Sequence, residues 1–397
     1  MKGLIGAAIL LLPLANSHAG NNIAPEHASE ASGALEWGGW IAAGFTGNPA
    51  SPDNHVNTPV GFNDQSNMIQ MNQLNLYLEK AINRDASSFD IGGRLDVMGG
   101  SDARFTQASG YWDANLINSA DSAYYSIAIP QAYLEASIPQ DLVHGLSAKI
   151  GHFYSIIGHE SVIAPGNFFY SHAYTMLYGE PFVHTGMLLN GQISDQVSIS
   201  AGAVTGPYND RQVTGKDNNV SDIGNWNFLG GSTWISESGD TSLALAFTTG
   251  AMSSASNANR TMASISLTHN ISQQWHYILQ HDHGYQGSLN PAMDHQIWYG
   301  LNQYLIYDID DQWSAGIRTE WFRDQNGGRV GTSPSQNNLL NPGSYYGLSA
   351  ALNWRGYDWL LIRPEIRYDL ADAQTPAFDD GTSDHQWLLS LSSVIQF

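Results

Sequence analysis

The chain has 397 residues, of which 13% are charged and 11% are aromatic, and it contains no cysteine. Charged residues are about half as frequent as in an average soluble domain, and the absence of cysteine excludes a disulfide framework. The formal net charge of -21 argues against nucleic acid or an anionic surface as a partner, and its plainest interpretation is acidic, solvated external loops.

The N-terminus predicts an export signal over residues 1–19. Lys2 supplies a positive charge, residues 4–14 form a short apolar core, and Ser17-His18-Ala19 offers small residues for cleavage. Residues 20–34 are polar, and we expect a flexible periplasmic segment there. No later segment approaches about eighteen consecutive apolar residues, which argues against an inner-membrane helical protein.

The remainder, residues 35–397, predicts an all-β protein of about 16 strands, within a range of 14 to 18. Apolar and polar residues alternate with the period of two that a strand imposes. Phe89, Ile91 and Leu95, for example, oppose Asp90 and Arg94. The predicted strand cores are 37–45, 70–80, 89–99, 130–138, 146–152, 184–193, 196–205, 225–235, 241–250, 261–271, 274–284, 295–307, 312–323, 344–355, 358–371 and 385–397.

The connections between these strands alternate between short and long. Short turns such as 194–195 and 308–311 are followed by long, polar, glycine-rich joins such as 46–66 and 206–223. This asymmetry is typical of an antiparallel up-and-down barrel in an outer membrane, with short periplasmic turns and long outer loops. A soluble β-sandwich would not need so many consecutive strands with this loop pattern.

The chain ends in Phe397, after a strand whose odd positions are mainly large and apolar and whose even positions are smaller and more polar. Outer-membrane barrels commonly end on such an aromatic carboxylate, which the barrel-assembly machinery reads. Aromatic residues also lie toward strand ends on the expected outer face, as interface girdles require. These are Trp275, Tyr277, Tyr299, Tyr307, Trp313, Trp354, Tyr368 and Trp387.

The segment 150–186 carries a family resemblance. It reads Ile-Gly-His-Phe-Tyr from residue 150, Ile157-Gly158-His159-Glu160, Asn-Phe-Phe-Tyr-Ser from residue 167, Pro181, and His-Thr-Gly from residue 184. This pattern resembles the OmpL-like family of bacterial outer-membrane β-barrel porins. The resemblance implies a pore-forming barrel whose solute is not fixed by the family.

The third long connection, 153–183, is more apolar and aromatic than an exposed outer loop should be. We therefore predict that it folds into the lumen as the pore constriction, with Glu160, Tyr170 and Glu180 near the narrowest point. An apolar cap over the mouth, or a contact between subunits of a trimer, is the alternative.

Charged residues expected to face the lumen cluster late in the chain. We predict that they line the pore and create a transverse field, with the loop carboxylates opposite. The alternative is that they pair with one another and only stiffen the wall. The predicted pore-lining residues are Arg94, Asp96, Lys149, Arg318, Glu320, Arg363, Glu365, Arg367 and Asp369.

Two further hypotheses are weaker. His281 and His283 lie two residues apart on one strand face, a spacing that can hold Zn or Cu, but no second shell is visible, and we expect no metal and no cofactor. An outer-membrane hydrolase could use Ser264 or Ser266 with His269 and His276, but the serines share the lumen-side parity.

The sequence therefore predicts an outer-membrane porin, and not an enzyme, that passes small hydrophilic solutes and ions by passive diffusion. A non-conducting surface or adhesin-type barrel is the alternative. Outer-membrane lipids, lipopolysaccharide and the barrel-assembly machinery are the expected partners, and analogy with porins suggests a homotrimer.

Overall fold

The fold is taken from a computed structural model of the whole chain. The structure describes residues 33–84, 89–107, 124–139, 143–206, 224–252, 258–288, 295–331 and 340–397. The predicted signal peptide, 1–19, and most of the segment 20–34 lie outside the described residues.

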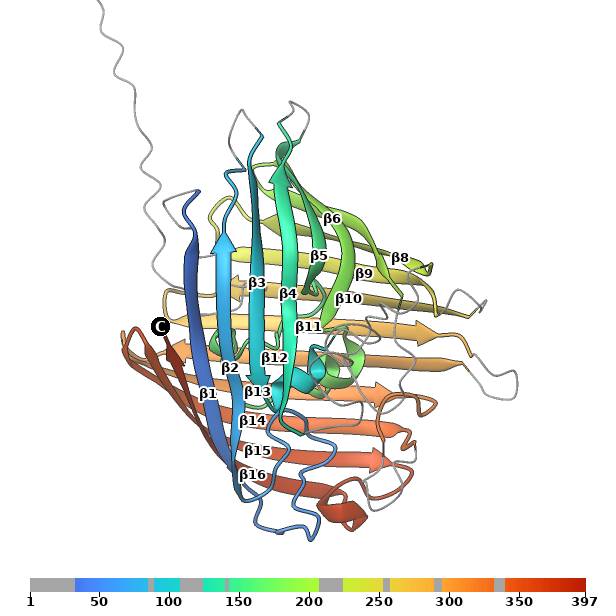
Figure 1. Cartoon of the computed structure of the whole chain (residues 1–397). Helices are drawn as coiled ribbons and strands as arrows, with labels where there is room; N and C mark the ends of the chain where they lie inside the picture. Colours follow the sequence, from blue (N-terminus) through green and yellow to red (C-terminus); the bar gives the residue numbers. More distant parts are fainter. Residues whose placement is uncertain are drawn as a thin grey trace, which may run out of the picture.

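In the described residues, sixteen antiparallel strands form one closed barrel (Figure 1). Each strand pairs with its neighbours in the chain, and β1 closes the ring by pairing with β16. The fold class and strand number predicted from the sequence are confirmed. The strands are β1 Glu36–Gly47, β2 Met68–Lys80, β3 Ile91–Gly100, β4 Ser126–Ser137, β5 His144–Tyr154, β6 Val183–Ser194, β7 Val197–Thr205, β8 Trp226–Ile235, β9 Thr241–Ala251, β10 Asn259–Asn270, β11 Trp275–Gln286, β12 Gln296–Asp308, β13 Trp313–Asp324, β14 Gly343–Tyr357, β15 Leu360–Ala373 and β16 His385–Gln396.

Closure satisfies the backbone, because every strand has a hydrogen-bonded partner on both sides and no edge faces hydrocarbon. Side-chain alternation then fixes which face is lipid-exposed. In β16, Trp387, Leu389 and Leu391 are about half exposed, whereas Leu388 and Ser392 are buried. A slip of one residue would exchange these two sets, so the pattern also fixes the register.

The fourth strand begins earlier than its predicted core, at Ser126 instead of residue 130. Pro130, which has no N–H to give to the ladder, lies inside this strand. The pairing of β3 with β4 shifts between Asp96 and Met98. This irregularity accommodates the proline inside the strand.

Connections between the strands alternate as predicted. Residues 195–196 join β6 to β7 and residues 358–359 join β14 to β15, whereas 155–182 join β5 to β6. Because β1 and β16 are neighbours, both ends of the barrel chain lie at the end of the short turns. In the described part of the chain, none of the helical turns is long and apolar enough to cross a membrane.

Aromatic residues pair on the outer surface near strand ends. Trp275 lies 4.6 Å from Tyr307 between ring centroids, and Tyr368 lies 4.6 Å from Trp387. Trp313 is 6.3 Å from Trp354. Rings with an apolar body and a polar edge are suited to the boundary between hydrocarbon and headgroups.

Candidate functional site: the loop inside the barrel

The connection 155–182, which we call the inner loop, lies inside the barrel. It contains two short helical turns, η3 Ala164–Gly166 and η4 Thr175–Gly179, seen among the strands in Figure 1. Its residues hydrogen-bond to inward-facing side chains in the middle of strands that lie far away in the sequence. The predicted loop, 153–183, includes the last two residues of β5 and the first residue of β6.

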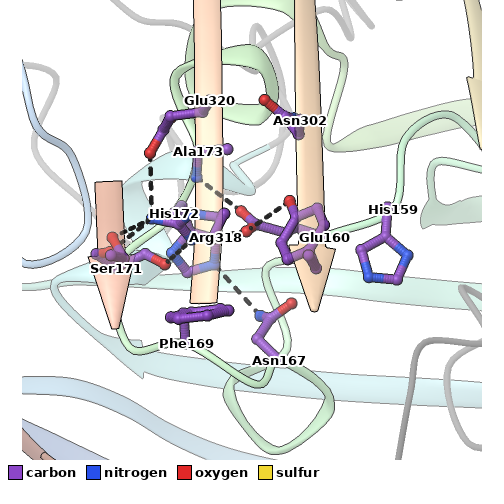
Figure 2. A network of polar contacts seen from close by, with 12 residues as sticks. His159, Glu160, Asn167, Phe169, Ser171, His172, Ala173, Asn302, Arg318 and Glu320 are labelled. Carbon is purple, nitrogen blue, oxygen red and sulfur yellow. Dashed lines mark hydrogen bonds and ion pairs between the residues drawn. The ribbon is translucent and has the colours of Figure 1, made fainter. Parts of the chain in front are cut away.

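Glu160 is bound from three directions (Figure 2). One carboxylate oxygen accepts a hydrogen bond from Arg318 of β13 at 2.8 Å and another from the Tyr304 hydroxyl of β12 at 3.0 Å. The other oxygen accepts from the backbone N–H of Ala173 at 2.8 Å. Burial opposes ionisation, but Arg318 and these donors hold the pKa of Glu160 below its ordinary value. Glu160 is therefore a buried anion that joins both arms of the inner loop to the wall.

Arg318 extends this contact into a network. Its guanidinium donates to the backbone oxygen and to the hydroxyl of Ser171, each at 2.7 Å. It lies 3.3 Å from Glu320, which accepts from the N–H of Tyr174 at 2.6 Å. Arg367 lies 3.0 Å from Glu320 and also donates to the backbone oxygen of His172 at 3.0 Å.

Strand β15 holds the next part of the loop. Glu365 accepts hydrogen bonds from the N–H groups of Tyr170 and Ser171 at 2.8 and 3.1 Å. Arg363 donates to the backbone oxygens of Ala164 and Asn167 at 3.0 and 2.7 Å. Backbone groups of the loop, which has no ladder of its own, are thus satisfied by wall side chains.

The Tyr170 side chain contacts the first two strands, β1 and β2. Its hydroxyl donates to Asn72 of β2 at 2.9 Å, and its ring lies directly over Gly44 of β1. A Cβ at Gly44 would come within 2.5 Å of the ring. Glycine is therefore required there by the close approach of the ring, and the inner loop touches the wall on both sides of the barrel closure.

Glu180, near the end of the loop, meets β11. It accepts a hydrogen bond from Gln280 at 2.6 Å, and the same amide nitrogen donates to Asp282 at 3.0 Å. Burial, together with the neighbouring Asp282, raises the pKa of Glu180 well above its ordinary value. Beside it, the indole N–H of Trp298 donates to the backbone oxygen of Gly179 at 3.1 Å.

The remaining predicted lining residues form a second cluster, apart from the contacts described above. Arg94 of β3 lies 2.6 Å from Asp96 and 2.8 Å from Glu79 of β2. Its guanidinium also lies 4.3 Å from the ring centre of Tyr77. Lys149 of β5 lies 4.2 Å from the ring centre of Tyr133.

The wall charges are buried, and Arg318, Glu320, Arg367 and Asp369 are ion-paired, whereas Arg363 and Glu365 bind the inner loop without an ion-pair partner. Arg318 and Asp369 have no exposed area, and Arg363 and Arg367 are 2% and 1% exposed. Glu320 and Glu365 are 5% exposed. From the sequence we expected these groups to face an open lumen, whereas the inner loop covers them. Arg318, Glu320, Arg367 and Asp369 pair with one another as the alternative describes, Arg363 and Glu365 do not, and the effect of all six on solutes stays a prediction.

Several uncharged residues at this interface were not predicted. Gln73 of β2 donates to the backbone oxygen of Val162 at 2.6 Å and accepts from Ala164 N–H at 3.1 Å. Thr175 donates to Asn302 of β12 at 3.0 Å. A signal for the β2 residues does exist, because residues 70–75 carry four amide side chains in a membrane strand, where such groups need partners.

The metal and hydrolase hypotheses gain no support from the geometry. His281 and His283 are exposed and lie on the outer face with Tyr285, and the described residues hold no group of three or more possible metal ligands. Ser266 pairs across β10 and β11 with Gln280, whereas His276 pairs with Asn270. His276 instead contacts Asp308 at 2.9 Å, so serine and histidine are not brought together.

At the C-terminus, the backbone of Phe397 exchanges two hydrogen bonds with Gly39 of β1, at 2.9 and 3.0 Å. The Phe397 side chain is 54% exposed. Its position at the barrel closure is compatible with the predicted role in assembly, which stays a prediction.

Comparison with known proteins supports this architecture. The family model described as "Putative beta-barrel porin-2, OmpL-like" matches residues 34–397. Among curated proteins, none matches the sequence.

Three solved structures illustrate the structural similarity. The outer membrane channel DcaP of Acinetobacter baumannii is 10% identical with a TM-score of 0.58, over 93% of this chain and 99% of that chain. OmpT, an outer membrane protein of Vibrio cholerae in a trimer form, is 9% identical with a TM-score of 0.57, over 92% and 100%. An anion-selective porin from Comamonas acidovorans is 7% identical with a TM-score of 0.56, over 92% and 99%.

At such low identity the solved structures establish the fold alone, whereas the family model covers the whole barrel. The chain therefore belongs to the OmpL-like family of β-barrel porins, and it is a porin of the bacterial outer membrane.

Proposed function

We propose that the inner loop sets the constriction of a passive diffusion channel for small hydrophilic solutes and ions. The observation that carries this proposal is the buried network joining Glu160 to Arg318 and the loop backbone to Glu320, Glu365 and Arg363. These contacts hold roughly thirty residues of chain inside a barrel that would otherwise enclose a wide aqueous space.

Glu160, Tyr170 and Glu180 act in this proposal as positioning residues. Each is at most 9% exposed, so none presents its polar group freely to a passing solute. Glu160 ties the loop to β13, Tyr170 ties it to β1 and β2, and Glu180 ties it to β11. They determine the width of the passage by fixing where the loop lies.

We further propose that the chain has no enzymatic activity and needs no cofactor. The separation of Ser266 from His276 supports the first point, because acyl transfer requires nucleophile and base within hydrogen-bond reach. Outer-membrane lipids, lipopolysaccharide and the barrel-assembly machinery are its proposed partners. A homotrimer is proposed by analogy with the trimer form of the OmpT structure.

Single-channel recording in planar bilayers tests the constriction. A variant in which residues 162–176 are replaced by a short Gly-Ser linker should conduct several-fold more current than the natural chain, because it removes every loop residue held by β15 and all those held by β13 except Glu160. Circular dichroism and retention of the folded form in detergent gels confirm that the barrel has formed. An unchanged conductance in a folded variant would contradict the proposal.

A further inference from the structure

The inner loop carries two buried glutamates, and only one of them meets a cation. Glu160 lies 2.8 Å from Arg318 of β13. Glu180 is 1% exposed, and none of the ion pairs formed within the described part of the chain includes it. Because a buried carboxylate without a cation is costly, the other neighbours of Glu180 determine its charge state.

One of these neighbours is a second carboxyl group, that of Asp282 in β11. Asp282 has no exposed area and lies within hydrogen-bonding reach of Glu180. Gln280, on the same inner face of β11, donates from one amide nitrogen to both groups, at 2.6 Å to Glu180 and 3.0 Å to Asp282. A single nitrogen that contacts both groups keeps them close together. We call Glu180 and Asp282 the carboxyl pair.

The orientation of the Gln280 amide is fixed from the other side. Its oxygen accepts a hydrogen bond from the backbone N–H of His159 at 3.1 Å. A backbone N–H can only donate, so the amide oxygen faces His159 and the amide nitrogen faces the carboxyl pair. A hydrogen-bond donor therefore already lies between the two acids, which disfavours a metal cation at the same place.

The carboxyl pair lacks one donor. The Oδ2 atom of Asp282 is buried and has no hydrogen-bond partner among the described residues. Ionised carboxylates are acceptors only, and two of them side by side repel, whereas a carboxyl group and a carboxylate share a proton. One proton shared by Glu180 and Asp282 supplies a donor and removes one of the two negative charges.

The first part of the inner loop encloses the carboxyl pair. A Cβ at Gly158 would overlap a carboxyl oxygen of Glu180, and the φ of Gly158 is +93°. Glycine is therefore required there both by the close approach and by the backbone conformation. Since Glu180 is packed between residue 158 and β11, its ionised form cannot be hydrated unless the loop moves.

The other groups around the carboxyl pair do not neutralise it. Glu160 adds a further negative charge. Strand β10 places Ser264 opposite Asp282, and β12 places Gly300 there, so neither neighbouring strand brings a charge. His281 is exposed on the outer face and contacts the Gly300 oxygen at 2.8 Å.

The nearest basic residues are engaged elsewhere or uncharged. Arg260 of β10 donates to Gln286 at 2.8 Å, and Arg329 lies 4.5 Å from the ring centre of Trp298. Burial lowers the pKa of His159 to about 4, so its ring carries no charge at neutral pH. Burial, Asp282 and Glu160 together raise the pKa of Glu180, against the hydrogen bond from Gln280.

We propose that the carboxyl pair is a proton-dependent latch that holds the end of the inner loop, residues 175–182, on β11. With one shared proton, the pair attaches the loop to the wall. When that proton passes to solvent, two adjacent anions remain, and their repulsion releases the loop. This inference rests on the proposed function, because release widens the passage only if the inner loop sets the constriction.

The direction of the pH dependence follows from the raised pKa of Glu180. In a released loop this side chain is hydrated and has the ordinary pKa of about 4.3. Its contribution to docking is therefore complete below that value and is lost as the pH rises through the raised pKa. A metal cation bridging the same two groups would act in the opposite direction, because it binds their ionised forms.

The alkaline response is measured in two ways on the full chain. The natural chain has no cysteine, so Met176→Cys, at a residue of η4 that is 1% exposed, reports release of the loop through its rate of reaction with a neutral maleimide. Single-channel recording reports passage. Variants are compared at the same pH, between about pH 7 and about pH 9, because the thiolate fraction itself rises with pH.

Two substitutions in the Met176→Cys background remove the titration. Glu180→Gln and Asp282→Asn each replace one acid by an amide that keeps its shape and can donate to the remaining carboxylate. Glu79→Gln is the matched control, because Glu79 lies on β2 and is paired with Arg94 at 2.8 Å. Circular dichroism and migration of the folded form in detergent gels confirm that each barrel has formed.

The latch predicts that the thiol rate of the parent and of Glu79→Gln rises several-fold with pH relative to Glu180→Gln and Asp282→Asn, and that mean conductance rises with it. An equal pH dependence in all four chains would overturn the latch. A thiol rate that rises as predicted while conductance stays constant would support the latch and contradict the constriction. A rate that falls with pH and recovers on adding a chelator would identify a bridging cation and overturn the shared proton.

Discussion

Replacing Arg318 with methionine removes the cation that joins the inner loop to the wall while keeping a long apolar stem. The natural guanidinium has no exposed area and contacts Glu160, Glu320 and Ser171. The substitution leaves the carboxylates of Glu160 and Glu320 buried without this cation. Breaking a buried ion pair by removing one partner costs about 3–5 kcal/mol.

The barrel does not need to unfold to relieve this cost, because the loop can detach and let water reach Glu160. Taking about 3 kcal/mol as the bias toward detachment, the equilibrium between docked and detached loop shifts by roughly two orders of magnitude. Single-channel recordings of Arg318→Met should therefore show higher mean conductance and frequent current steps. The natural chain should show a steadier, smaller current.

Arg323→Met is the matched control on the same strand. Arg323 lies near the outer end of β13, and its contacts to Gln325 and Ser344 are 3.2 and 3.4 Å long. Exposed contacts of this kind contribute about 0–1 kcal/mol, so its conductance should match that of the natural chain. Adding Glu160→Gln to Arg318→Met should recover part of the lost docking, because it removes one uncompensated charge. Equal behaviour of the two methionine variants would refute the reasoning.

Three further predictions address other contacts. Burial lowers the pKa of His172 to about 4, so its contribution to docking is complete above its ordinary pKa of about 6.5 and is lost as the pH falls toward 4. Glu160, whose pKa is also lowered, acts in the same direction. Glu180, whose pKa is raised, acts in the opposite direction. Acidification should therefore loosen the loop and raise conductance more in the natural chain than in His172→Phe, which keeps the stacking on Phe62. If the conductance of His172→Phe depends on pH as that of the natural chain does, the role given to His172 is wrong. Gly44→Ala should displace the Tyr170 ring at about 1–3 kcal/mol and alter conductance, whereas Gly47→Ala, whose Cβ meets nothing closer than 3.4 Å, should be tolerated. Indistinguishable conductance in the two variants would disprove the close-packing argument. Deleting Phe397 removes two closing hydrogen bonds to Gly39 and should lower the yield in outer membranes far more than refolding yield in detergent. An equal loss in both would indicate a purely structural role.

Local features of the sequence determined the barrel. A strand imposes a period of two, and turns are encoded within a few residues, so the sixteen strands and the short-long alternation could be read without tertiary information. The positions of Trp387, Leu389 and Leu391 on the outer face follow from this same period.

The tertiary structure alone decided what the wall charges do. The strand period of two placed Arg318, Glu320, Arg363 and Arg367 on the inner face of the barrel. It could not distinguish an open lumen from one occupied by the inner loop. Glu160 and Arg318 are 158 residues apart in the chain, and their contact depends on the path of a loop without periodicity. Once that path is known, the burial of the wall charges and their contacts with the loop are explained. Side-chain pattern determines which face a residue occupies, whereas long-range packing determines what that face meets.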